Sequence, residues 1–177
     1  MTQLPSDEQL LAVLLETAPT KTELARQIRL LRNFLEYRFF TSIETTPTLL
    51  EYCAAREIPT EDGDIMKMWR SDFINAFDKH NAYKRINTMT EDIKNLPYIS
   101  LYAPVALDTA SLIKIGAWFR QTTGANMLLD IHIDPERVGG CAIAQNGVYR
   151  DYSLHYILEK HKDAVKNVLD TYAGQIT

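Results

Sequence analysis

The chain has 177 residues, of which 46% are hydrophobic and 24% are charged. This balance is that of a soluble globular protein with one large domain or two small ones. A net charge of −4 and a pI of about 5.6 exclude general electrostatic attraction to nucleic acid or anionic lipid. The two cysteines, Cys53 and Cys141, have no CxxC spacing, which is typical of reduced, buried thiols.

The sequence also bears on the compartment. No run approaches the ~20 apolar residues that cross a bilayer. The start of the chain is acidic at Asp7 and Glu8 and has neither the basic region of a signal peptide nor the Arg-rich pattern of a transit peptide. We therefore expect a cytoplasmic protein whose membrane association comes through partners.

The first half has the apolar spacing of helices. Ser6 is a plausible N-cap for the first helix, and Thr20 or Thr22 for the second. The spacing predicts helices over residues 7–16, about 20–39, 47–56, 62–80 and 83–95. In the fourth, the residues expected to face inward are Ile65, Met68, Trp69, Phe73, Ile74 and Phe77. Residues 1–95 are thus predicted to form an all-α helical bundle with short connections.

The second half alternates strands and helices. The patterns predict a strand over 98–103, a helix from Asp108 to Gly124, a strand over 127–133 and two short strands over 141–145 and 148–151. In the 127–133 strand, Met127, Leu129, Ile131 and Ile133 are expected to share one face. Asn146-Gly147 between two extended runs is the signal of a tight hairpin.

A final helix of about 20 residues should begin after Ser153, its predicted N-cap. Its apolar stripe is Leu154, Ile157, Leu158, His161, Val165, Val168, Leu169 and Tyr172. Residues 98–177 are thus predicted to form a small α+β C-terminal domain in the order strand-helix-strand-hairpin-helix, and the fold class is α+β overall.

One segment of the second half has a more specific pattern. It runs from Ile133-Asp134-Pro135 through Gly139-Gly140 and Asn146-Gly147 to Asp151-Tyr152-Ser153. This order and spacing resembles the C-terminal signature of the F-type ATP synthase delta subunit (OSCP-like) family, and the resemblance covers about residues 98–175. The first half lacks the Tyr-Ala-x-Ala-Leu-like run with which members of that family open. The signature residues Asp134, Pro135, Gly139, Gly140, Asn146, Gly147, Asp151 and Ser153 suit turns and caps, and no nucleophile or ligand cage is among them.

The resemblance implies a non-catalytic stator subunit without a cofactor. In the family, the N-terminal domain binds N-terminal segments of the alpha subunits at the catalytic head. The C-terminal domain binds the b subunit of the peripheral stalk, and the joint resists rotor torque. The resemblance therefore implies that 1–95 binds the head and 98–177 binds the stalk.

Candidate contact residues can be assigned from that role. For the stalk, they are two residues off the main stripe of the 108–124 helix, Ile113 and Trp118, and the distal stripe residues of the final helix, Val165, Val168, Leu169 and Tyr172. For the head, they are two basic and three apolar residues: Arg26, Arg29, Met68, Trp69 and Phe73. The same apolar residues could instead be core, and the same arginines a solvated face.

Two other classes of function stay open. One is a free-standing helical adaptor or regulatory protein with a delta-like C-terminal domain. The other is a zinc-dependent hydrolase using Asp130, His132 and Asp134, which alternate along one strand and so share a face. One strand supplies few ligands for zinc, and a solvated outer face explains the same pattern.

Overall fold

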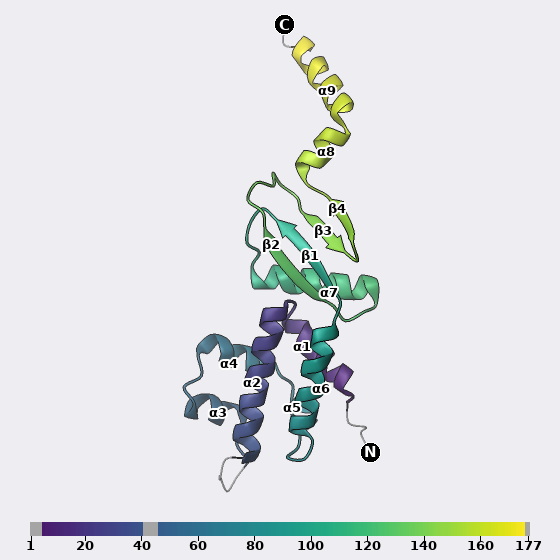
Figure 1. Cartoon of the computed structure of the whole chain (residues 1–177). Coiled ribbons are helices and arrows are strands. Elements are labelled where there is room, and N and C mark those ends of the chain that lie inside the picture. The colour runs from purple at the N-terminus through teal and green to yellow at the C-terminus, as the bar shows by residue number, and fades with distance from the viewer. Residues whose placement is uncertain (1–4, 41–45, 176–177) are drawn as a thin grey trace. The chain divides into compact units, whose positions relative to one another are not determined.

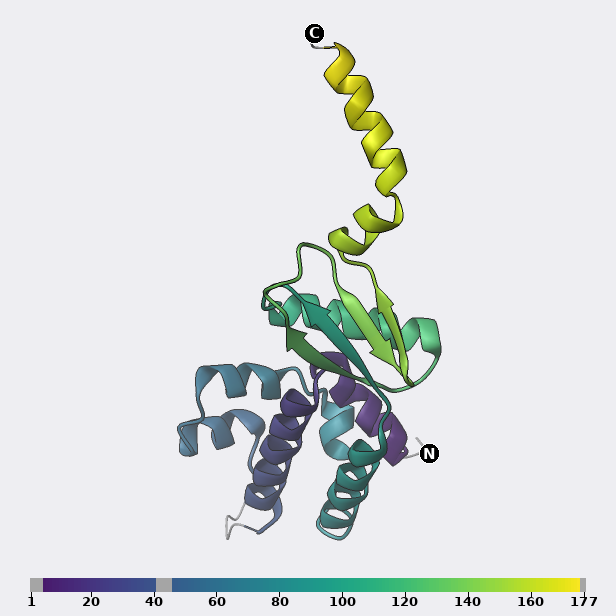
Figure 2. The ribbon, with the colours of Figure 1, turned by 45° about the horizontal axis from the view of Figure 1, so that its top comes forward.

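The computed structural model describes residues 5–40 and 46–175. Within these ranges the chain is a mixed α+β protein with nine helices and one four-stranded sheet (Figures 1 and 2). It divides into a helical unit, Met1–Pro97 with Leu112–Leu128, and a sheet unit, Tyr98–Ser111 with Leu129–Thr177.

Six helices of the helical unit precede the first strand. They are α1 (Asp7–Thr17), α2 (Lys21–Phe40), α3 (Leu49–Ala55), α4 (Thr60–Lys67), α5 (Ser71–Asn75) and α6 (Ala82–Asn95). Capping boxes begin α1, at Ser6 and Gln9, and α3, at Thr48 and Glu51, so two backbone amides at each helix start are satisfied locally. Thr20 caps α2 by accepting a hydrogen bond from Glu23 N at 3.3 Å.

The core of the helical unit is built from the inner stripes of these helices. Its largest fully buried side chains are Leu10, Leu14, Leu15, Leu24, Leu31, Phe34, Leu35, Met66, Ile86 and Met89. Leu128, which lies far along the chain, belongs to the same cluster. The apolar spacing that predicted the first two helices places Leu10, Leu11, Leu14 and Leu15 on one stripe and Leu24, Ile28, Leu31, Leu35 and Phe39 on the other, and all of them are buried except Phe39, which is half-buried.

The predicted single helix over 62–80 is wrong. The chain turns after α4, where Met68 N and Trp69 N bond to carbonyls three residues earlier, the tighter pattern that ends a helix. The turn lets Trp69 and Phe73 both enter the core, at 6% and 2% exposure, and leaves Met68 59% exposed. Burial of two aromatic side chains here outweighs the periodic pattern that favoured one helix.

Helix α7 (Thr109–Thr123) begins and ends as the sequence predicts. Asp108 Oδ1 accepts from Ser111 N at 2.8 Å, and Gly124 follows the helix with φ of 67°. In the middle, Gly116 passes close to the α1–α2 connection. A Cβ at Gly116 would lie 2.9 Å from Pro19 Cβ, closer than two carbon atoms can approach.

The sheet has the strand order β2-β1-β3-β4. The strands are β1 (Tyr98–Ala103), β2 (Leu128–Ile133), β3 (Ala142–Gln145) and β4 (Val148–Asp151). β3 is antiparallel to both neighbours, with Leu101 opposite Ile143 and Gln145 opposite Val148. Along β1 the alternation is as predicted, because Ile99, Leu101 and Ala103 are buried on one face.

The predicted alternation along the second strand is wrong at both ends. Leu128, expected on the outer face, is 3% exposed because it joins the core of the helical unit. Ile133, expected inside, is 57% exposed at the end of β2. The strand is buried on both sides where it begins, so its period-two pattern does not report a single face.

The predicted single final helix is two helices, α8 (Leu154–Lys160) and α9 (Lys162–Gln175), as Figure 1 shows. Ser153 caps α8 as expected, accepting from Tyr156 N at 3.2 Å. His161 interrupts the helix with φ of −112° and ψ of 22°. Its expected place in one continuous apolar stripe is therefore not realised in this structure.

Gly116→Ala should destabilise the helical unit. The new methyl group must displace the rigid ring of Pro19 or tilt α7, and such overpacking costs about 1–3 kcal/mol. Gly63→Ala, inside α4 with nothing within 4 Å of the added carbon, is the matched control and should stabilise by up to about 1 kcal/mol. Thermal unfolding followed by circular dichroism measures both; equal shifts would contradict the close packing at Gly116.

Candidate interaction surfaces

Most residues of the predicted structural signature meet where the β2–β3 loop crosses the end of β4. We call this region, residues 134–141 with 151–153, the junction. Arg137 holds it together, donating from Nη1 to Asp151 Oδ1 at 2.9 Å and from Nη2 to Asp134 Oδ2 at 3.2 Å. The turn itself closes by a hydrogen bond from Arg137 N to Asp134 O, with Pro135 inside it. Two distant stretches of chain are thus fixed by one guanidinium.

The glycine pair of the junction is required for different reasons. Both residues have positive φ, 64° at Gly139 and 71° at Gly140. At Gly140 a Cβ would also lie 2.3 Å from the Tyr152 carbonyl oxygen. Backbone bonds run from Tyr152 N to Cys141 O at 2.8 Å and from Leu154 N to Gly139 O at 3.3 Å. Only glycine permits this close crossing of two backbones.

Asp151 and Ser153 then start α8. Asp151 Oδ1 accepts from Ser153 N at 2.7 Å, and Ser153 is 3% exposed. The hydrogen bonds from Ser153, reinforced by Arg137, lower the pKa of Asp151 from its usual 3.8. The junction therefore sets the point and the direction at which α8 leaves the sheet.

Between β3 and β4, Asn146 and Gly147 form the predicted hairpin turn. Their φ angles are 51° and 78°, the pair of positive values that a type I′ turn needs. This turn and the junction account for all eight residues of the predicted structural signature.

Helices α8 and α9 expose most of their apolar side chains. Six large ones are between 44% and 63% exposed: Leu154, Tyr156, Ile157, Leu158, Val168 and Leu169. Val165 is half-buried. Of the predicted stalk contacts, Val165, Val168 and Leu169 thus lie on an accessible helix, while the side chain of Tyr172 lies outside the described residues. Exposed apolar surface of this kind on a helix is typical of a site that binds another protein.

The other two predicted stalk contacts are on α7. Trp118 is 56% exposed and packs edge-on against the buried Phe119, with ring centroids 4.8 Å apart. Ile113 is half-buried and lies five residues before Trp118 on the same helix. Trp118 therefore offers a large accessible aromatic surface on a helix whose other side is anchored at Gly116 and Phe119.

The predicted head contacts are not alike in the structure. Trp69 and Phe73 are core residues and offer no contact surface here, whereas Met68 is exposed. Arg26 is held by α4, with Nε 2.6 Å from Asp62 Oδ1 and Nη2 3.4 Å from Glu61 Oε2. Arg29 is exposed. Met68 and Arg29 are thus the accessible members of this set.

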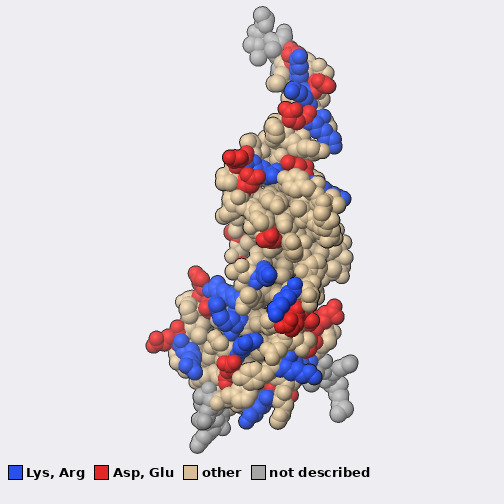
Figure 3. Space-filling view, in the orientation of Figure 1, with Lys and Arg blue, Asp and Glu red and all other residues tan. Residues whose placement is uncertain are grey.

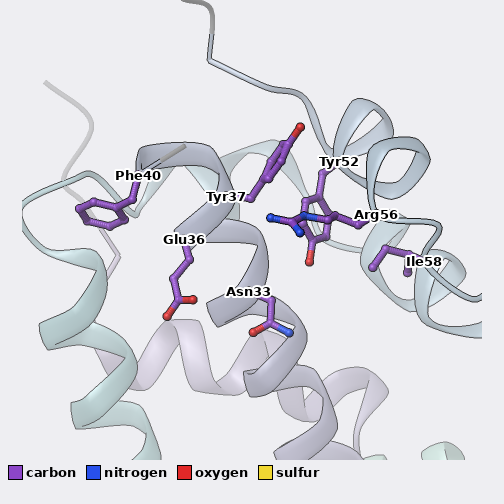
Figure 4. Close-up of a pocket in the computed structure, with 7 residues that line it drawn as sticks. All are labelled: Asn33, Glu36, Tyr37, Phe40, Tyr52, Arg56 and Ile58. Atoms are coloured by element: carbon purple, nitrogen blue, oxygen red, sulfur yellow. The ribbon is translucent and has the colours of Figure 1, made fainter. Parts of the chain in front are cut away.

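A hollow of about 430 Å³ opens on the helical unit along α2 (Figure 4). Four of its residues lie on one face of α2 at spacings of three, one and three: Asn33, Glu36, Tyr37 and Phe40. The opposite wall is Tyr52, Arg56 and Ile58. The Arg56 guanidinium lies 5.3 Å from the centre of the Tyr37 ring. Burial raises the pKa of Tyr52 above its usual value. Sequence reasoning missed this hollow, although the spacing on α2 was visible.

The residues of the zinc alternative do not converge. His132 bonds to Asp130, Nε2 to Oδ2 at 2.9 Å, and stacks on Tyr102 with ring centroids 4.7 Å apart. Asp134 turns instead toward Arg137. Among residues 5–40 and 46–175, no group of three or more His, Cys, Asp or Glu side chains is placed to hold a metal ion. The stacked pair forms part of the outer sheet face, together with Tyr149, which is 54% exposed.

Charge is unevenly distributed on the face drawn in Figure 3. Lys, Arg, Asp and Glu intermix over the helices of the helical unit, whereas the surface over the sheet is largely uncharged. Such a surface suits association with protein better than with phosphate groups.

Arg137 is the junction residue to which sequence reasoning gave no role. Its partners Asp134 and Asp151 were assigned to a turn and a helix start, and they are 17 residues apart in the sequence (151 − 134). Its side chain is 10% exposed, and a buried guanidinium requires acidic partners. That burial is visible only in the structure, and the sequence showed only the spacing of three residues between Asp134 and Arg137.

Comparison of the sequence with models of known protein families and with curated proteins finds no match. None of the helices within the described ranges is long and apolar enough to cross a membrane.

Gly140→Ala should destabilise the sheet unit more than Gly147→Ala. At both positions alanine has to adopt left-handed backbone angles, which costs about 1–2 kcal/mol. Only at Gly140 does the added carbon also collide with backbone atoms. Chemical denaturation followed by circular dichroism compares the two variants. Equal losses would show that the backbones at Gly140 and Tyr152 can separate freely.

Asp151→Asn should flatten the dependence of stability on acid pH. Because the folded state lowers the Asp151 pKa, its contribution is complete above the usual value of 3.8 and is lost as pH falls through the lower folded-state value. The variant should melt at a lower temperature than the parent at neutral pH, and this difference should shrink below about pH 4. Asp170→Asn, on the exposed surface of α9, is the control. Parallel melting profiles for parent and Asp151→Asn would contradict the role given to this carboxylate.

Proposed function

We propose that the chain is a non-catalytic stator subunit of a rotary F-type ATP synthase. It links N-terminal segments of the alpha subunits in the catalytic head to the b subunit of the peripheral stalk. Its task is to resist the torque that the rotor exerts on the head during turnover. Affinity and stiffness meet this task, and no chemical step on this chain is needed.

In this proposal the chain works as two modules. An N-terminal helical bundle binds the head, and a small C-terminal α+β domain binds the stalk. The protein is cytoplasmic and meets the membrane only indirectly, as a peripheral part of the synthase complex. Met68 and Arg29 are the accessible head-contact residues of the predicted set.

The observation that carries the proposal is the exposed apolar surface of α8 and α9. Leaving large aliphatic side chains such as Leu158 and Leu169 in water costs about 25 cal/mol for each Å² of apolar surface. A partner that covers them recovers this free energy. A helix lying along another helix is the simplest way to cover a continuous apolar stripe.

The junction supports the same role mechanically. A stator must transmit force between its two contacts without yielding. The Arg137 contacts to Asp134 and Asp151, and the backbone crossing at Gly140, tie the start of α8 to the sheet. Force applied to α8 therefore reaches the sheet through several hydrogen bonds at once.

A tagged copy of the chain, isolated from native membranes under mild detergent, tests the proposal. The expected result is co-purification of the alpha, beta and b subunits in constant ratio. Recovery of the chain without any of these subunits would contradict a stator role. It would then favour the free-standing adaptor, whose partners would be of another kind.

Trp118→Asp should weaken binding to the b subunit by about tenfold or more, because a charge would replace an accessible aromatic contact. The unfolding transition should stay unchanged, since the ring is exposed. Ala117→Asp adds the same charge at the neighbouring exposed position and should leave binding intact. Titration calorimetry with purified b subunit measures affinity. Unaltered binding by Trp118→Asp, or its global unfolding, would remove Trp118 from the interface.

A further inference from the structure

The apolar side of α8 and α9 contains a heptad pattern that passes through the polar residue His161 and is flanked by the apolar residues Ile157 and Leu169. From Leu154 the steps alternate four and three through Leu158, His161, Val165, Val168 and Tyr172. This is the a/d spacing of a heptad repeat, in which Leu158 and Val165 take a positions and Leu154 and Val168 take d positions. The register runs through His161 without a shift.

The bend at His161 has no cause in the sequence. Helices bend sharply at proline, at glycine or where the backbone ladder is opened. Neither proline nor glycine occurs between Tyr152 and Tyr172. The backbone ladder is open only at the bend: His161 N bonds to Ile157 O at 3.1 Å and Val165 N to His161 O at 3.0 Å, whereas the three amides between them, all within the described ranges, make no bond to the carbonyls four residues earlier. A solvent-exposed helix of this length is marginal by itself, and most helical stability in proteins comes from packing.

We propose that α8 and α9 join into one continuous helix when they pack, as one strand of a coiled coil, against a stalk helix with an aliphatic seam and acidic flanks. This inference deepens the proposed function and rests on it for the identity of the partner. The seam, defined as Leu154, Leu158, His161, Val165, Val168 and Tyr172, is about 28 Å long in a continuous helix.

The charges of the residues beside the seam indicate which side chains the partner helix should carry. Positions e and g flank the seam, and here they carry His155, Lys162, Leu169, Ile157, Ala164 and Thr171. No acidic residue is among them. Lys162 is the one full charge, with a side chain 73% exposed and only a 3.9 Å contact to Glu159. The acidic residues Asp163 and Asp170 lie on the opposite face at f positions.

A second copy of this chain fits the flanks poorly. In a parallel pair, the g position Ile157 would face the e position Lys162. In an antiparallel pair, e positions would face each other and bring basic side chains together. Neither arrangement supplies a carboxylate to Lys162, whereas a partner with Glu at its flanking positions does.

The probe is a synthetic helix with Leu at a and d and Glu at e and g, titrated into the full chain by fluorescence anisotropy. Its counterpart has Lys at e and g. The acidic peptide should bind at least about tenfold more tightly than the basic one. In hydrogen exchange, the amides of residues 159–165 should slow when the acidic peptide is bound.

Val168→Asp should abolish binding of the acidic peptide, while Asn167→Asp, which adds the same charge one residue off the seam, should leave it within about twofold. Both residues are exposed, so circular dichroism should show the same fold for each variant. Equal effects of the two substitutions, equal binding of both peptides, or unchanged exchange at His161 would overturn the proposal.

Sedimentation of the full chain tests the other possible occupant of the seam, which is a second copy of this chain. A stable dimer that Val168→Asp dissociates would assign the seam to a second copy and overturn the heteromeric partner. The peptide measurements do not involve the synthase. A seam that binds the acidic peptide in a chain that fails to co-purify with synthase subunits would therefore contradict the stator role alone.

Discussion

The close crossing of the β2–β3 loop over the end of β4 fixes the point at which α8 leaves the sheet. Gly140 brings its backbone against the Tyr152 carbonyl so closely that no side chain fits. Arg137 binds Asp151 in the same place, and Asp151 in turn holds the amide of Ser153, the N-cap of α8. The start of α8 is therefore fixed by backbone contact, by an ion pair and by a helix cap. Beyond this cap, the rest of the chain leaves α8 and α9 largely in water.

Local chemistry made several elements of this fold predictable. Asn146-Gly147, Asp108 with Gly124, and Ser153 each impose a turn or a cap through their own side chain or backbone freedom, and each acts in the structure as the sequence indicates. The alternation along β1 was equally readable, because one face of that strand is buried and the other is not.

The errors have a common cause, which is packing between residues distant in sequence. The helix predicted over 62–80 turns because Trp69 and Phe73 gain more from the core than from a regular stripe. Leu128 is buried by helices that lie far from it in the chain. Trp69 and Phe73, chosen as contact residues from their position on an expected surface, are for the same reason inside. Arg137 was missed because its two acidic partners are separated by many residues and meet only after the hairpin forms.

The final helix is a different case, because there the sequence and the structure disagree without a core to decide between them. The periodic pattern extends through His161, and the chain bends there with no residue that breaks helices. The apolar pattern of α8 and α9 is longer than the part that the fold buries, and this difference is informative. In the proposed role, the missing packing partner of α8 and α9 is a helix of the stalk, and the junction is the anchor that transmits its pull.

The most direct test is a cryo-electron microscopy map, at a resolution that shows side chains, of the rotary ATP synthase proposed to contain this chain. The account predicts the chain between head and stalk, with residues 154–172 in one unbroken helix along a stalk helix. A map with α8 and α9 still bent at His161 and in contact with solvent would contradict it.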